Sequence, residues 1–181
     1  MYLLAASRCE NRVAGAVLAF ELLTGLRAGE ARNLQWGSVD IDKGTIHLRA
    51  SMGGVDAFLP LSGAAAGLLQ GLPREHGNLY VFPGAKGGRV GVRSLFRYGR
   101  ALAAQIGLPE DFRPNHGLRR SLASHLASSG EVDLYTIRKL PTHKTPKMTR
   151  RYAHLRDESL RRGAEAMGRA FHVMETIARR S

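Results

Sequence analysis

The sequence has one cysteine, no long apolar run and only 7% aromatic residues. A lone thiol, Cys9, cannot form an internal disulfide or a metal site built from several thiolates. No apolar stretch approaches the roughly 20 residues that cross a bilayer, and no basic segment precedes the short apolar patch at the start. We therefore predict neither a membrane helix nor a signal peptide, and we expect a cytoplasmic protein.

Negative charge is also scarce. Lys and Arg number 27 against 15 Asp and Glu, which gives a formal net charge of +12. Most of this surplus lies in the second half of the chain, and residues 138–151 contain no acid at all. The bases of that segment are Arg138, Lys139, Lys144, Lys147, Arg150 and Arg151. Such a distribution is typical of a surface that binds a polyanion, although a solvated basic face remains the alternative.

The hydrophobic pattern predicts a mostly helical α+β domain. Val13, Val17 and Phe20 recur at helical spacing within residues 12–24, and apolar and polar residues alternate in a predicted antiparallel sheet near residues 39–61. A short strand is expected at 79–82 and a glycine-rich loop at 84–91. Further helices are expected at about 28–34, 62–72, 93–106, 116–129 and 133–140. Another is expected to begin at Thr145, and an amphipathic helix is expected in the terminal segment. We divide the chain into a domain of residues 1–156 and a terminal helix in 157–181, which either packs on the same domain or docks on a neighbouring subunit.

Two groups of side chains suggest phosphate chemistry. His116 and Arg119 are three residues apart in a predicted helix, so both project from one face, where a guanidinium fork and an imidazole suit a phosphate. Tyr152 follows two arginines. A phenol with a pKa of about 10 is a poor nucleophile unless positive charge or a base stabilises its oxyanion. Each group alone also fits ordinary surface or core residues.

Three segments in this order resemble the tyrosine recombinase (phage integrase) family. They are "TGLRAGEARNL" at 24–34, "HGLRRSLASHLASSG" at 116–130 and "LPTHKTPKMTRRYAHL" at 140–155. The resemblance runs from about residue 13 to 155, and Tyr152 follows His143 by nine positions, as in the family pattern.

The resemblance implies a site and a reaction. Arg27 matches the first catalytic arginine, Glu30 its supporting acid, His116 and Arg119 the H-x-x-R pair, His143 the second histidine and Tyr152 the nucleophile. In the family, the tyrosine attacks a DNA phosphodiester and forms a 3′-phosphotyrosyl link without a metal or other cofactor. Double-stranded DNA is then the expected partner, contacted at its phosphates by the six bases of residues 138–151. A dimer or tetramer on DNA is the expected assembly.

The sequence departs from the family pattern at two positions and in its length. Met52 stands where the family carries a β-hairpin lysine that protonates the leaving 5′ oxygen, and a thioether cannot donate a proton. Lys86 in the glycine-rich loop is the candidate substitute. Pro141 replaces the usual residues before His143. The separate amino-terminal clamp domain of the family is not found ahead of this domain. We therefore expect reduced activity.

Three other functions stay open. The chain is an inactive DNA-binding remnant if Met52 and Pro141 have abolished cleavage. A metal-dependent nuclease would use His116, His143 and His154, although no metal-ligand motif supports this. A type IB topoisomerase would share the chemistry but would relax supercoiled DNA without strand exchange.

Overall fold

In a computed structural model of the chain, the residues described are 1–51, 55–74, 76–114, 117–118, 164–166 and 168–169. The helices are α1 (Tyr2–Ser7), α2 (Arg12–Thr24), α3 (Ala28–Arg32), the 3₁₀ helix η1 (Trp36–Ser38), α4 (Gly63–Gln70) and α5 (Val92–Gln105). The strands are β1 (Val39–Asp40), β2 (Thr45–Ser51) and β3 (Val55–Pro60). The predicted helices at 133–140 and from Thr145 lie outside the described residues.

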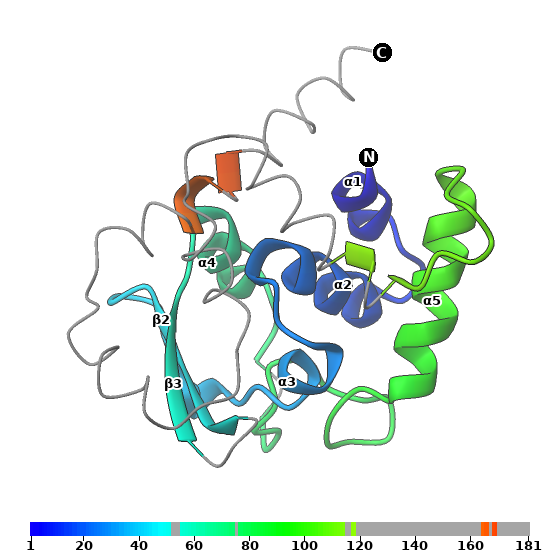
Figure 1. The fold of residues 1–181 in the computed structure, drawn as a ribbon. Helices are drawn as coiled ribbons and strands as arrows, with labels where there is room; N and C mark the ends of the chain where they lie inside the picture. The colour runs from blue at the N-terminus through cyan, green and yellow to red at the C-terminus, as the bar shows by residue number, and fades with distance from the viewer. Residues whose placement is uncertain (52–54, 75, 115–116, 119–163, 167, 170–181) are drawn as a thin grey trace.

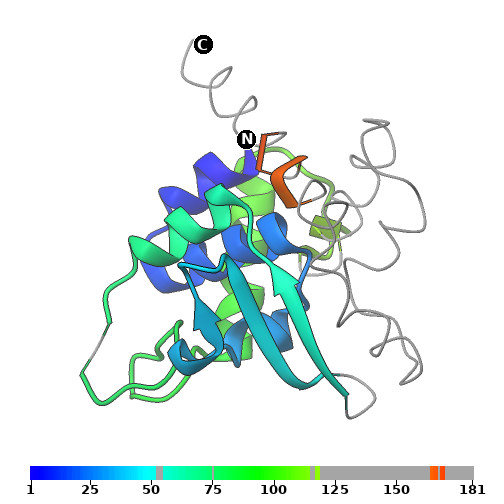
Figure 2. The ribbon, with the colours of Figure 1, turned by 90° about the vertical axis from the view of Figure 1, so that its left-hand side faces the viewer.

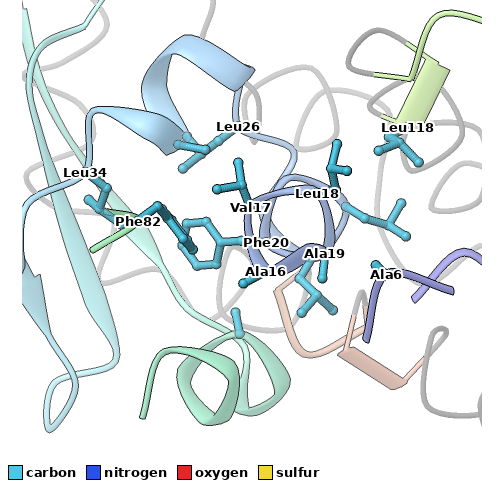
Figure 3. Close-up of a cluster of buried hydrophobic side chains, with 14 of the residues drawn as sticks. Ala6, Ala16, Val17, Leu18, Ala19, Phe20, Leu26, Leu34, Phe82 and Leu118 are labelled. Carbon is cyan, nitrogen blue, oxygen red and sulfur yellow. The ribbon is translucent and has the colours of Figure 1, made fainter. Parts of the chain in front are cut away.

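Helix α2 forms the centre of the domain. All residues from Ala14 to Thr24 are buried, which agrees with an apolar sequence on every side of the helix. Helices α1, α3, α4 and α5 all contact it. The sheet lies on one side of α2 and α5 on the other (Figure 1). Among the core side chains, Phe20 stacks at a tilt against Phe82 with ring centroids 5.5 Å apart (Figure 3).

The small sheet has the order β1-β2-β3, with both neighbouring pairs antiparallel. Ile46 pairs with Leu59, and both side chains are buried toward the helices. On the outer face His47 stacks on Phe58, with ring centroids 4.5 Å apart. The alternation predicted for residues 39–61 is therefore confirmed, and the sheet covers one side of the helical layer (Figure 2).

Two local predictions need correction. The stretch 79–82, expected to be a strand, forms only an isolated bridge between Gln35 and Tyr80. Only two backbone bonds join it to residues 34–36, from the Trp36 N–H to the Leu79 carbonyl and from the Val81 N–H to the Leu34 carbonyl, so the facing segment is too short for a ladder. The six-residue helix α1 was not predicted.

Five residues of the carboxy-terminal segment are described, and all of them are helical. Ala164 and Ala166 are buried, and the Glu165 carboxylate accepts a 3.1 Å hydrogen bond from the Gly63 N–H at the start of α4. This segment lies beside α4 in both views (Figures 1 and 2). Docking on a neighbouring subunit stays a prediction. Among the described residues, no helix has the length and apolar character needed to cross a membrane.

Candidate functional site

Arg27 is placed by the sharp turn that ends α2. Gly25 adopts φ 70°, a left-handed conformation that glycine tolerates, and its N–H donates to the Glu21 carbonyl at 2.8 Å. The next residue, Leu26, is 1% exposed and points into the core (Figure 3). The turn is thus fixed on both sides, and Arg27 follows it as the residue immediately before α3.

Glu30 holds Arg27 by both its backbone and its side chain. One carboxylate oxygen accepts the Arg27 N–H at 2.9 Å, and the other lies 3.1 Å from the guanidinium Nη1. The bond to the backbone caps the first turn of α3, and the ion pair orients the guanidinium. The Arg27 side chain is 34% exposed, so it is open to a ligand from outside the protein.

The H-x-x-R segment is described only at its two central residues. Leu118 is 3% exposed and lies beside Leu18 of α2 (Figure 3). A Cβ at Gly117 would overlap the ring of Phe112, so a side chain there would displace the segment. These contacts anchor the segment on the same core that carries Arg27.

Apart from Lys86, the remaining predicted site residues lie outside the described part of the chain, as does Met52. They are His116, Arg119, His143 and Tyr152, and the six bases of residues 138–151. The structure therefore places Arg27 and Glu30 together and leaves the other assignments as predictions. The three histidines of the alternative nuclease lie outside the described residues too, and the described part contains no group of three metal-ligating side chains.

Lys86 lies in a small folded loop ahead of α5. The Gly87 N–H donates to the Gly84 carbonyl at 2.9 Å, and Gly87 and Gly88 both have positive φ angles, 82° and 65°. The loop therefore forms a tight turn, and the Lys86 side chain is exposed. Its role as a substitute proton donor stays a prediction.

Sequence analysis missed two cationic residues near α3, Arg32 and Arg89. The Arg32 Nε donates a 2.9 Å hydrogen bond to the Val90 carbonyl, 58 positions further along the chain. Burial lowers the pKa of the Arg32 guanidinium, and the like charge of Arg89 lowers it further, while Tyr80 raises it. No local sequence signal marks this contact, because it joins two distant loops.

Comparison with known proteins identifies the family. The model of the phage integrase family matches residues 3–159, most of the chain. The chain belongs to the phage integrase family of tyrosine recombinases. Residues 3–159 correspond to its catalytic domain.

Relatives and solved structures agree with this assignment. Tyrosine recombinase XerC of Xanthomonas campestris pv. campestris is 33% identical over 144 residues, which cover 77% of this chain and 44% of that protein. The chain thus spans less than half the length of this relative. The catalytic domain of bacteriophage HP1 integrase is similar with a TM-score of 0.57 and 25% identity, over 84% of this chain and 81% of that domain. XerH recombinase, solved in a pre-cleavage complex with its difH substrate, matches with a TM-score of 0.62 and 21% identity over 86% and 48% of the two chains.

Proposed function

We propose that this chain is the catalytic domain of a site-specific DNA recombinase or integrase that cuts and rejoins double-stranded DNA through Tyr152. The observation that carries the proposal is the Arg27–Glu30 pair. It holds a half-buried guanidinium in a fixed orientation at the position where the family has its first catalytic arginine. XerH, a structural relative, is solved on a DNA substrate, which supports DNA as the substrate class.

In the proposed reaction the Tyr152 oxygen attacks the scissile phosphorus and loses its proton. The bond to the 5′ oxygen breaks, and the DNA is left with a 3′-phosphotyrosyl link and a 5′-hydroxyl. Negative charge grows on the non-bridging oxygens, where Arg27, Arg119 and the two histidines donate hydrogen bonds. The 5′-hydroxyl of a partner strand then reverses the step, so no cofactor is consumed. Strand exchange needs several active sites, and we propose a dimer or tetramer assembled on DNA.

The leaving 5′ oxygen must gain a proton, and Met52 cannot supply it. A general acid typically contributes about a hundredfold to ten-thousandfold in rate, so its loss slows cleavage without removing the nucleophile. We propose Lys86 as the substitute donor. The competing function, a DNA-binding remnant, is favoured by Met52 and Pro141 and predicts no cleavage under any condition.

A suicide DNA substrate separates these two functions. Incubation of a nicked site with the chain should give a protein–DNA adduct that resists denaturation, and Tyr152→Phe should abolish it. Tyr98→Phe is the matched control, because it removes only a hydroxyl that Arg97 contacts at 3.0 Å on the surface. Adduct formation should also survive a chelator.

A second substrate tests the missing acid. A sulfur in place of the bridging 5′ oxygen leaves without a proton, so it should be cleaved faster than the oxygen substrate by this chain. If neither substrate forms an adduct, the chain is a binding remnant and the proposed activity is wrong.

A further inference from the structure

Arg32, the last residue of α3, ties this helix to the loop ahead of α5. Its Nε donates to the Val90 carbonyl at 2.9 Å, and its side chain is half-buried. Because Nε is occupied, the bond fixes the plane of the guanidinium and leaves the two terminal nitrogens to act as donors. The loop and the carboxy-terminal end of α3 meet at the lower edge of the domain in Figure 1.

The loop that carries Arg89 is held in one conformation. Pro83 and Arg89 form a bridge, the Gly84 N–H donates to the Gly88 carbonyl at 3.1 Å, and the Val90 N–H donates to the Phe82 carbonyl at 2.9 Å. Phe82 and Val90 are buried in the core. A Cβ at Gly84 would approach the Arg89 carbonyl oxygen to 2.6 Å, so the turn requires glycine there. The position of Arg89 is therefore set by the fold.

The 2.9 Å hydrogen bond from Arg32 Nε to the Val90 carbonyl places the Arg32 guanidinium next to the backbone that carries Arg89. Burial lowers the pKa of the Arg32 guanidinium, and the like charge of Arg89 lowers it further. Within the described part of the chain, neither arginine forms an ion pair with a carboxylate. Two neighbouring guanidiniums repel each other, and an anion that binds both relieves that repulsion. Tyr80 adds a phenol close enough to act on Arg32.

We propose that Arg32 and Arg89 form a binding site for a backbone phosphate of duplex DNA, separate from the phosphate held by Arg27. This site rests on the proposed function, because DNA is the polyanion that Arg27 would bind from the other end of the same helix.

The contact would fix the register of the protein on the duplex and would carry no sequence preference, since phosphates are the same at every base pair. It adds to the six bases of residues 138–151 and lies in a different part of the chain.

The test is the salt dependence of duplex binding. The Arg32→Ala/Arg89→Ala double variant of the full chain is titrated with a fluorescent 30-bp duplex at several salt concentrations. The slope of log K against log salt should become less steep by about 0.9, the change expected for one lost phosphate contact. Affinity should fall by the same factor for unrelated duplex sequences. Arg8→Ala is the control, because Arg8 is an exposed arginine beside α1, on the opposite side of the domain from α3 (Figures 1 and 2).

Arg32→Ala also removes the bond to Val90, and a loosened loop would confuse the result. Arg89→Gln avoids this, because it removes charge from an exposed side chain and keeps the backbone bonds of the loop. It should make the slope less steep by at most about 0.9, with an unchanged melting temperature.

A slope in both variants equal to that of Arg8→Ala overturns the site, and so does a wild-type chain that fails to bind duplex DNA. The adduct assay distinguishes this failure from that of the proposed function. An intact Tyr152 adduct with an unchanged slope rejects only the phosphate site. A reduced slope without any adduct rejects only the recombinase activity.

Discussion

Two glutamates nine positions apart, Glu21 in α2 and Glu30 in α3, have opposite surroundings. Glu30 uses both carboxylate oxygens, one on the Arg27 N–H and one on its guanidinium. Glu21 is 1% exposed, and neither of its oxygens has a hydrogen-bond partner among the described residues. Burial raises the pKa of Glu21 to about 8. Glu30, beside the predicted active site, is therefore hydrogen-bonded as a carboxylate. Glu21, in the core, favours its protonated form.

The two carboxylates differ in whether a positive charge lies near them. Among the described residues, no positive charge contributes to the pKa of Glu21, which burial raises. The Tyr2 hydroxyl is itself buried without a described partner, and burial together with Glu21 raises its pKa. Around Glu30 the cation is within 3.1 Å. The first environment should affect stability, and the second orients a guanidinium that we propose takes part in catalysis.

The largest effect should come from the pH dependence of stability through Glu21. Unfolded, this carboxyl titrates near 4.5, and in the folded protein near 8, so the folded state holds a proton that the unfolded state has lost between these values. The free energy of unfolding should therefore fall as pH rises, by on the order of 5 kcal/mol across this window. Glu21→Gln removes the titration and should gain stability over wild type as pH increases.

Urea denaturation at several pH values between 5 and 8.5 measures this. Glu10→Gln is the matched control, because Glu10 is exposed and makes the same change in net charge. The interpretation of Glu21 fails if its Gln variant and wild type show parallel pH profiles.

The next effect concerns the bonded acid. Glu30→Ala removes both contacts with Arg27 and should slow adduct formation at Tyr152 by about a hundredfold, because a misplaced guanidinium no longer stabilises the charged phosphate. Stability should fall by only about 1 kcal/mol, the usual cost of a lost helix cap. Single-turnover rates and the Kd for DNA, measured together, distinguish positioning from unfolding.

A positioning role predicts a reduced rate with a nearly unchanged Kd and melting temperature. Glu110→Ala, at an exposed acid, serves as the control and should leave the rate intact. Equal losses of rate and of folded protein in Glu30→Ala would contradict the role assigned to Glu30.

The sequence predicted the fold well where the signals are local. Helix α2 has the predicted bounds, and the Ser62 hydroxyl accepts from the Ala65 N–H at 3.2 Å, as expected for a capping serine. Alternation in residues 39–61 predicted the sheet because one face of each strand is buried. Arg27 was identified from its motif, and its bonds to Glu30 span only three residues.

Features that depend on distant contacts could not be predicted. Helix α1 has no side-chain cap, and it packs where Gly15 lets α2 approach the Ala6 carbonyl, since a Cβ at Gly15 would overlap that oxygen. The burial of Glu21 follows from α2 being covered by several other elements, which its local sequence does not indicate. The bond from Arg32 to Val90 links residues 58 positions apart. In each case packing, not local pattern, decides the environment.

The smallest effect is expected at a third acid, Asp40, which forms an exposed ion pair with Lys43. Asp40 lies 2.8 Å from Lys43 on the surface, and the hydrogen bond from that lysine lowers the pKa of Asp40. Water already solvates both side chains, and exposed pairs gain little from mutual attraction, so Lys43→Ala should leave the urea midpoint unchanged within error. Added salt should not change the difference in urea midpoint between Lys43→Ala and wild type either. A clear drop in the midpoint would mean that the turn between β1 and β2 depends on this pair, and that an exposed carboxylate can matter as much as the bonded Glu30.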